Sequence, residues 1–453
     1  MSSNFCIAAA SGLAFALGFC APAAAATAAR FADVVRLEGG QLSMFDGTAI
    51  DHLALLACTV TACQPIPFQI DERDASGRWV LDQGPMPTTD DPPGVLDAND
   101  LLLFMADDAG DRVAPGVLSI PPACQGGNKG KGASAACVNH PTPLAGKEGL
   151  VGAEIALYDP LDRTTRWVYV VAFADHAPRA AAQDVEYDPL TDRVHGRRVS
   201  LGFTDGVPGY LAVGDGANLL DRLKVRASAT FLFGLIHFTR SEADLRTEFM
   251  GWHAGPIRVV RGQRQWVRLG WGIHSPTFGS YTYFYRDFAE LPVGLYLNFK
   301  PTYFFSDILV QVILDFRDLR GWSLLVPSVP DPLPIDGNMT AQKSALESSA
   351  DQWFALCGPQ ISLVQSMDVS ASLATVRHRL LYRETVRPEP PEAVPGEEPG
   401  IGFQLDQWER VGAGAHQLES VSYALPSAVD VREFMRVRRA PLAVAVRPVV
   451  SDR

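Results

Sequence analysis

Aromatic, basic and acidic residues gather between positions 237 and 286 of this 453-residue chain. The group comprises His237, Arg240, Glu242, Arg258, Trp271, His274, Tyr281, Tyr283, Tyr285 and Arg286. Aromatic rings stack on sugar rings, while Arg, His and carboxylate groups hydrogen-bond hydroxyls or pair with uronate carboxylates. The composition favours a site for an oligo- or polysaccharide, including an acidic one.

Two reactions fit these residue types. A Tyr or His removes a proton next to a carboxylate neutralised by Arg, which gives elimination. Alternatively, a Glu/Asp pair hydrolyses a glycosidic bond. A purely structural interpretation competes with both, because Tyr281, Tyr283 and Tyr285 alternate as on any strand face. The sequence identifies no catalytic residue.

An acidic cluster at Asp97, Asn99 and Asp100 supplies hard oxygen ligands of the kind that suit Ca²⁺. Its spacing does not match the EF-hand loop, and Asp and Asn are also common turn residues. Calcium and a turn are therefore competing interpretations, and no other cofactor is evident.

The commonest catalytic signatures are absent from the sequence. It contains no Gly-x-Ser-x-Gly, phosphate loop, His-Glu-x-x-His or Cys-x-x-Cys-His. The net charge of −12 argues against nucleic acid as a partner. A short basic cluster at Arg436, Arg438 and Arg439 is interpreted as the solvated face of a strand.

Residues 1–26 are typical of a secretory signal peptide. The apolar stretch Ile7 to Phe19 is followed by small residues, Ala21-Pro-Ala-Ala-Ala-Ala. We expect export to the periplasm or the exterior. No later stretch approaches roughly 18 uninterrupted apolar residues, so we expect no transmembrane segment in the mature chain.

The cysteine pattern agrees with an oxidising compartment. Cys58 with Cys63, and Cys124 with Cys137, are spaced as local disulfides. Zinc is the competing interpretation, but His partners at finger spacing are lacking. Cys357 is expected to be a buried, small apolar side chain.

Alternation of apolar and polar residues predicts the fold class. Ile308, Val310, Val312, Leu314 and Phe316 recur every second position, which predicts a strand with the intervening Gln311, Asp315 and Arg317 towards solvent. Leu101-Leu-Leu-Phe-Met-Ala predicts a strand buried on both faces. We expect a mainly β protein, an antiparallel super-sandwich-like β-sandwich with a smaller N-terminal β unit and few short helices. Thr340–Ala350 is the best helix candidate.

Composition suggests the following boundaries. These are a signal peptide at 1–26, an N-terminal β unit at 27–122, a Gly/Lys-rich loop at 123–149, a central β-sandwich at 150–330, and C-terminal strands at 331–453 that complete the sandwich around a Pro/Glu-rich loop at 387–400.

Short segments resemble secreted proteins with a galactose-mutarotase-like super-sandwich. Pro65-Ile-Pro-Phe-Gln-Ile-Asp-Glu followed by Asp97-Ala-Asn-Asp-Leu-Leu-Leu-Phe-Met-Ala looks like the opening of that group. Gly255-Pro-Ile-Arg-Val-Val and Pro399-Gly-Ile-Gly-Phe with the later Ala440-Pro-Leu are similar to its recurring strands. The resemblance covers most of residues 60 to 445 and implies the fold. The group includes polysaccharide lyases and uncharacterised proteins, and no matched residue is a catalytic signature.

Two functions from different classes follow. The first is an exported carbohydrate-binding or carbohydrate-processing protein, which predicts that Tyr283, Trp271 and Arg258 converge in one cleft. The second is a non-enzymatic accessory or structural subunit of the cell envelope that packs against protein partners. It predicts a broad exposed apolar patch instead.

Overall fold

The computed structural model describes residues 30–60, 62–114, 150–180, 184–231, 234–270, 272–275, 277–384 and 399–450. The expected signal peptide, the Cys124 and Cys137 pair, Trp271 and most of the Pro/Glu-rich loop lie outside these residues.

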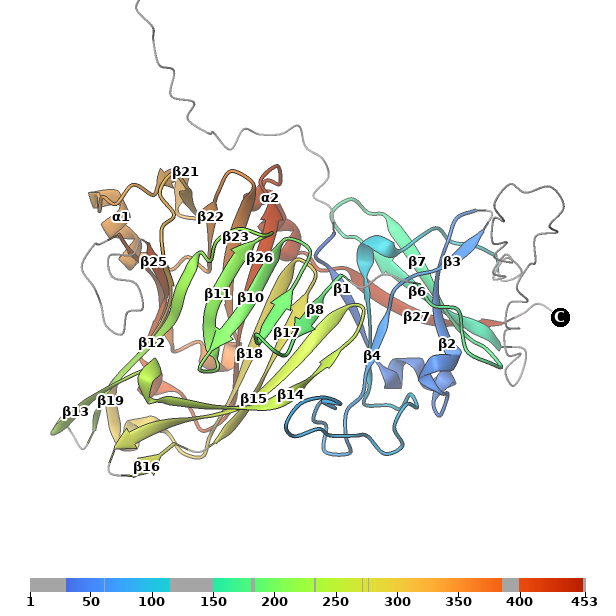
Figure 1. Cartoon of the computed structure of the whole chain (residues 1–453), viewed down its shortest axis with the longest axis horizontal. Coiled ribbons are helices and arrows are strands. Elements are labelled where there is room, and N and C mark those ends of the chain that lie inside the picture. The colour runs from blue at the N-terminus through green and yellow to red at the C-terminus, as the bar shows by residue number, and fades with distance from the viewer. Residues whose placement is uncertain are drawn as a thin grey trace, which may run out of the picture.

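Two sheets form an N-terminal unit (Figure 1). The three-stranded sheet comprises, in spatial order, β1 (Val34–Glu38), β5 (Leu101–Met105) and β4 (Gln69–Asp71). The five-stranded sheet comprises β27 (Ala443–Val450), β6 (Leu150–Tyr158), β7 (Thr165–Ala172), β2 (Leu53–Cys58) and β3 (Cys63–Pro65).

Three further sheets form the larger body. A ten-stranded sheet comprises, in order, β14 (Leu245–Ala254), β15 (Arg258–Gly270), β17 (Phe278–Tyr285), β18 (Phe288–Leu297), β26 (Gly414–Pro426), β23 (Ile361–Val369), β22 (Trp353–Cys357), β20 (Ser323–Val326) and β21 (Val329–Pro334), with β16 (Ile273–His274) beside β15. A five-stranded sheet comprises β13 (Ile236–Ser241), β12 (Leu220–Phe231), β19 (Phe305–Phe316), β25 (Gly400–Asp406) and β24 (Arg377–Arg383). A four-stranded sheet comprises β11 (Val207–Val213), β10 (Val199–Thr204), β9 (Arg193–His195) and β8 (Glu186–Asp188).

Apolar side chains join these sheets into layers. Leu102 and Phe104 of β5 face the five-stranded sheet of the N-terminal unit, where they pack with Leu55. Leu101, Leu103 and Met105 face the opposite way and pack with Tyr285 and Phe288 of the ten-stranded sheet. The prediction of a strand buried on both faces is confirmed, and β5 holds the two units together.

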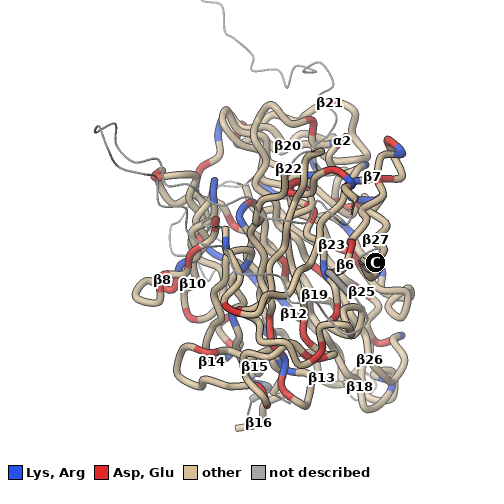
Figure 2. The backbone as a smooth tube through the Cα atoms, turned by 90° about the vertical axis from the view of Figure 1, so that its right-hand side faces the viewer, with Lys and Arg blue, Asp and Glu red and all other residues tan. Residues whose placement is uncertain are grey.

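The far side of the ten-stranded sheet is covered by the two remaining sheets. Val259 and Phe284 pack against Val194 of the four-stranded sheet. Leu363 packs with Leu380 of the five-stranded sheet that contains β19. The molecule is mainly β, with several antiparallel sheets and few short helices, as predicted. Figure 2 shows acidic and basic positions interspersed along its strands.

The C-terminal strand returns to the N-terminal unit. β6 pairs with β7 on one side and with the C-terminal strand β27 on the other. The sequence analysis assigned β6 and β7 to the central sandwich. Instead, Ile155 of β6 and Val170 of β7 contribute to the core of the N-terminal unit. Composition gave no sign of this return of the chain.

Two segments differ from their predicted conformation. Arg436 and Arg438 lie on the helix α2 (Val431–Arg438) and not on a strand. The Asp430 side chain accepts hydrogen bonds from the first turn, and Phe434 and Met435 are buried, as expected for a capped amphipathic helix. The predicted helix at 340–350 is shorter, with α1 (Ala341–Ala345) followed by a 3-10 turn at Leu346–Ser348.

The alternation in β19 is confirmed only in part on both sides of the strand. On the apolar side, Val312 is 36% exposed. Val310, Leu314 and Phe316 contribute to the sandwich core. Asp315 is buried rather than solvated, and its carboxylate lies 2.5 Å from the ammonium group of the buried Lys224 on β12. β19 lies between β12 and β25 within its sheet, and Asp315 is buried there against an opposite charge on β12.

Cys58 and Cys63 form the predicted disulfide, which links β2 to β3. Cys357 is buried, as expected. None of the described helices has the length and apolar character needed to cross a membrane.

Candidate functional site

One face of the ten-stranded sheet carries an aromatic and charged row, which we call the polar face. Side chains alternate along a strand, so cross-strand partners share a face. Arg258 pairs with Tyr285, and Gly262 pairs with Tyr281. The same face continues from Glu290 on β18 to Glu419 on β26. Its members are Glu248, His253, Arg258, Arg264, Tyr281, Tyr283, Tyr285, Glu290, Tyr296, Asp368 and Glu419.

The N-terminal unit covers half of this face, with Arg258 at the centre of the contact. The Arg258 side chain is buried, and its Nε donates to Asp71 Oδ2 over 2.6 Å. Its Nη1 donates to the Tyr285 hydroxyl over 3.0 Å, and its guanidinium lies 4.3 Å from the centroid of the Tyr283 ring. Arg258 and Tyr283 do converge, but in a contact closed to solvent. They join two units rather than line an open cleft.

A second, partly buried contact lies beside it. Arg36 on β1 donates to both carboxylate oxygens of Glu290 over 2.6 Å, and also to the Tyr285 hydroxyl over 3.0 Å. Burial raises the pKa of Tyr283 and of Tyr285 above the ordinary value for tyrosine. Both phenols therefore stay protonated at neutral pH, which does not suit a base for elimination.

The other half of the polar face is open where β17 and β18 diverge. These strands pair only at Tyr283 with Glu290 and Phe284 with Ala289. Residues 278–282 of β17 and 291–297 of β18 continue without pairing to each other, and we call these two segments the wedge. Pro292 suits such an edge because it has no N–H to donate. The wedge therefore offers two strand edges whose polar groups can meet a ligand.

Exposed aromatic rings flank the wedge on the polar face. Tyr281 is half-buried, and Tyr296 is 69% exposed. A Cβ atom placed on Gly279 or Gly294 would meet no atom within 4 Å, so the space above both strands is open. Arg264 and Glu248, next to Gly279, form an ion pair of 2.8 Å, and both side chains are largely exposed. The arrangement offers flat rings and paired charges around an accessible surface.

Glu419 brings a carboxyl group with altered acidity to this surface. Burial raises its pKa, and the nearby charges of Glu290 and Asp368 add to that shift. Asp368 is its direct cross-strand partner and is exposed. A carboxyl group with a raised pKa can donate a proton while its neighbour stays ionised. Sequence reasoning missed this pair, because the register that joins positions 368 and 419 is not visible in a single sequence.

His253 forms a further ionisable group at the edge of the N-terminal unit. Its Nδ1 lies 3.1 Å from Asp82 Oδ1, and its Nε2 lies 3.5 Å from Asp71 Oδ1. Burial lowers the pKa of His253, but the two carboxylates outweigh burial and the net shift is upward.

The remaining predicted sugar-binding residues lie elsewhere. His237 and Arg240 are on β13, and Glu242 begins the 3-10 turn Glu242–Asp244, at the sheet that contains β19. His274 is exposed on β16. Arg286 is buried at the β17–β18 turn, where its Nη2 donates to Asp107 Oδ2 over 2.5 Å. The predicted group is thus split, and of its members that the structure describes, Arg258, Tyr281, Tyr283 and Tyr285 share the polar face.

Asp97, Asn99 and Asp100 form a hydrogen-bonded turn. Asp100 Oδ1 accepts from the Arg73 amide and Oδ2 accepts from the Asp97 amide, over 3.1 and 2.9 Å. Asp97 Oδ1 accepts from the Asn99 amide over 2.9 Å. Burial raises the pKa of Asp100 to about 7. These contacts account for the residues as turn formers, and calcium binding stays a prediction.

Comparisons with known proteins give a distant likeness of fold. No protein-family model matches the chain, and no curated protein matches it. An α-mannosidase from Enterococcus faecalis V583 aligns with a TM-score of 0.38 and 8% identity over 67% of this chain and 40% of its own length. Heparan sulfate lyase HepC from Pedobacter heparinus aligns with a TM-score of 0.28 and 7% identity. That alignment covers 62% of this chain and 45% of the lyase. The chain thus spans less than half the length of either protein, and it bears a distant structural resemblance to carbohydrate-active enzymes.

Proposed function

We propose that the chain is an exported carbohydrate-binding protein and that the wedge of its polar face holds a segment of polysaccharide. The observation that carries the proposal is the open half of the polar face, where Tyr281 and Tyr296 flank two strand edges that do not pair with each other. Tyrosine rings supply stacking surfaces for sugar rings, and strand edges supply donors and acceptors for hydroxyls.

The charges around the wedge favour a neutral glycan over an acidic one. Arg264 is paired with Glu248, and Arg78 at the rim is paired with Asp74 over 2.7 Å. Arg36 is held by Glu290. An anionic sugar would have to displace a carboxylate from one of these arginines. The hydroxyls of a neutral sugar can instead hydrogen-bond to the outward-facing carboxylate lone pairs and guanidinium N–H groups, while the ion pairs stay formed.

Glu419 and Asp368 give the site a route to hydrolysis. Direct cross-strand partners have Cβ atoms about 4.5–5.5 Å apart, which is compatible with the spacing of about 5–5.5 Å between the carboxyl groups of retaining glycosidases. In this scheme Glu419 is the acid, because its pKa is raised, and Asp368 is the second carboxyl group. The raised pKa values of the tyrosines favour hydrolysis over elimination.

Affinity electrophoresis of the tag-free protein tests binding. The panel contains mannan and β-glucan as neutral glycans, and alginate and heparan sulfate as acidic ones. We expect retardation by a neutral glycan, and about tenfold weaker binding for Tyr281→Ala, in line with the loss of one stacking contact. Tyr303→Ala is the control, because Tyr303 is 62% exposed and lies in the turn Pro301–Tyr303, outside the wedge.

Two outcomes would remove the proposal. One is the absence of retardation by every glycan of the panel. The other is binding that Tyr281→Ala and Tyr296→Ala both leave unchanged. If Glu419→Gln still releases reducing sugar, the hydrolytic scheme is contradicted. The binding proposal is not affected by that result.

A second candidate function rests on a separate surface, which we call the aromatic end. Leu235, Ile236, Phe299, Tyr303 and Phe304 are all at least 41% exposed. Phe231 pairs with Ile236 between β12 and β13. The centroid of the Phe231 ring lies 6.5 Å from that of Phe304, and the centroids of the Phe304 and Phe299 rings are 5.4 Å apart. An exposed apolar group of this kind is what an accessory subunit would present to a protein partner.

A second copy of the chain is the partner that this surface fits. β13 is an edge strand, so its outer backbone groups can pair with another strand. Antiparallel pairing of two copies about Phe238 places Arg240 opposite Ile236 and creates no like-charged pair. Sedimentation velocity should then show a dimer that Ile236→Lys dissociates. A wild-type monomer at all concentrations would contradict this candidate.

A further inference from the structure

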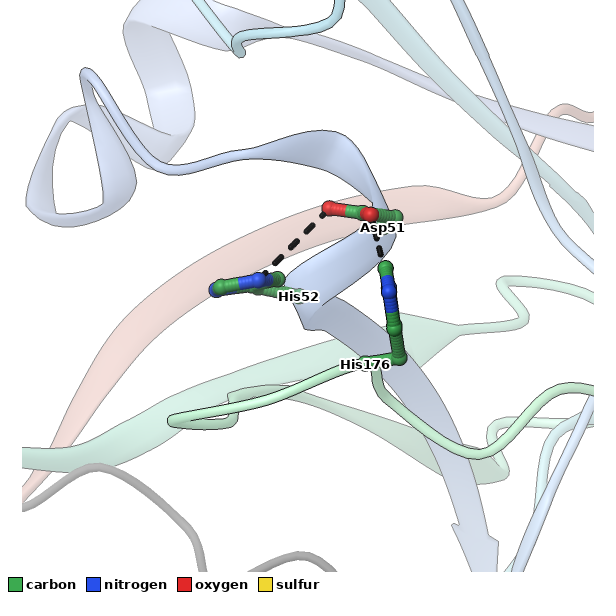
Figure 3. A group of neighbouring side chains, drawn as sticks. All are labelled: Asp51, His52 and His176. Atoms are coloured by element: carbon green, nitrogen blue, oxygen red, sulfur yellow. Dashed lines mark ion pairs between the residues drawn. The ribbon is translucent and has the colours of Figure 1, made fainter.

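Three side chains of the N-terminal unit converge away from the polar face. Asp51 and His52 belong to the 3-10 turn Ile50–His52, and His176 lies in the segment after β7 (Figure 3). Asp51 Oδ2 lies 2.7 Å from His176 Nδ1, and Asp51 Oδ1 lies 3.8 Å from His52 Nε2. One ligand atom from each residue lies within 4.8 Å of the other two.

Backbone hydrogen bonds fix the two segments that carry these side chains. The Phe173 amide donates to the His52 carbonyl over 2.9 Å, and the Ala177 amide donates to the Asp51 carbonyl over 2.8 Å. The Arg179 side chain donates to the Ile50 carbonyl over 2.6 Å. His176 is therefore held opposite Asp51 by bonds on both sides of it, although its side chain is 84% exposed. The backbone therefore places these three residues close together.

The two imidazoles approach the carboxylate in different ways. Each carboxylate oxygen of Asp51 faces one of the two rings, whose centroids are 6.0 Å apart with an interplanar angle of 89° (Figure 3). Only His176 is within hydrogen-bond distance of Asp51, because the contact with His52 is 3.8 Å. A cation placed among the three would be bound by two nitrogen atoms and one oxygen atom. Its remaining positions would face solvent.

We propose that Asp51, His52 and His176 form a binding site for a divalent transition-metal ion, with Zn²⁺ as the ion of best fit. Imidazole nitrogens select Zn²⁺, Cu²⁺ or Ni²⁺ over Mg²⁺ and Ca²⁺, which prefer oxygen ligands alone. Three protein ligands with a fourth position open to water is the usual arrangement of an accessible zinc site. The site is separate from the wedge, because its residues belong to the N-terminal unit and the wedge belongs to the ten-stranded sheet.

Isothermal titration of the tag-free, metal-depleted chain with ZnCl₂ tests the proposal. We expect one equivalent to bind, and His52→Ala or His176→Ala to weaken binding by at least about tenfold, since even outer contacts of a zinc site contribute 10–100-fold. His195→Ala is the matched control, because His195 is exposed and its Nδ1 contacts only Ser200 Oγ over 2.8 Å. Titration with MgCl₂ should give no heat of binding.

Co²⁺ provides a second readout that does not depend on affinity alone. Visible absorption of bound Co²⁺ should be present in the wild type and in His195→Ala, and lost in Asp51→Asn and His176→Ala. Circular dichroism of each variant shows whether it is folded, and His176 is exposed enough to be replaced without loss of packing. Absence of saturable Zn²⁺ binding would overturn the proposal. Equal affinity of wild type and His176→Ala would overturn it as well.

Discussion

Arg258 is a buried cation that connects the two units of the molecule. Its carboxylate partner, Asp71, is 2% exposed, and its ring partners Trp79 and Tyr283 shield the pair from water. Removing one partner of a buried ion pair leaves the other charge without compensation. The residue that the sequence suggested for sugar recognition thus has a structural role.

Replacing Arg258 should therefore destabilise the fold strongly. We expect Arg258→Met to lower the free energy of unfolding by about 3–5 kcal/mol, because Asp71 is left buried without its cation. Arg246→Ala is the matched control on the exposed part of the neighbouring strand, with an expected change within about 0.5 kcal/mol. Urea unfolding measures both, and equal midpoints for the two variants would contradict this role.

His253 should make stability depend on pH in a defined direction. Its pKa is raised in the folded state, so its contribution is complete below the unfolded pKa of about 6.5 and is lost as the pH rises through the folded value. Asp82→Asn removes the nearest carboxylate and should lower the pKa of His253 in an NMR titration of its imidazole protons. Asp244→Asn is the control. An unchanged pKa of His253 in Asp82→Asn would show that the contact with Asp82 does not raise that pKa.

At the scale of elements, close approach between strands decides which glycines are needed. A Cβ atom on Gly402 of β25 would lie 1.9 Å from the Val312 carbonyl oxygen of β19, whereas one on Gly294 of β18 would meet no atom within 4 Å. The first glycine is required by packing between neighbouring strands. The second lies on the open wedge.

Alanine substitution at these two positions should separate the two cases. Gly402→Ala should lower the melting temperature by several degrees, because an overpacked contact costs about 1–3 kcal/mol. Gly294→Ala should leave it nearly unchanged. Differential scanning calorimetry compares them, and a larger loss for Gly294→Ala would mean that the wedge is closed rather than open.

The strands could be predicted because each carries its period within a short stretch of sequence. The alternation in residues 308–316 indicated β19, and the apolar run at 101–105 indicated β5 as buried on both faces. The helix α2 was missed because its three arginines were read alone, although Asp430 at the cap and apolar residues at 431, 434 and 435 have helical spacing. A local sequence pattern predicted the element correctly where all residues of the segment were considered together.

The site could be predicted only in part, because it depends on which strands are neighbours. Tyr281, Tyr283 and Tyr285 share a face by alternation alone, which the sequence shows. Asp368 and Glu419 meet only through the pairing of β23 with β26, and that register is set by the whole sheet. The same limit explains why His237, Arg240 and Glu242 were grouped with residues of another sheet.

At the scale of the whole molecule, the N-terminal unit covers half of the polar face and leaves the other half exposed at the wedge. β5 packs on both units, and the partly exposed Arg36 and the buried Arg258 add charged contacts across the same boundary. The N-terminal unit therefore determines where a ligand can reach the sheet. The exposed half and the aromatic end are separate surfaces, and a ligand on one need not affect the other.

Hydrogen–deuterium exchange with and without the tightest-binding glycan of the panel tests the central claim most directly. Because the facing edges of β17 and β18 do not pair with each other, amides at these edges should exchange quickly in the free protein. We predict slower exchange on glycan binding at residues 278–282 and 291–297, and no change at 236–241. Protection confined to residues 236–241, or none at saturating glycan, would contradict the account.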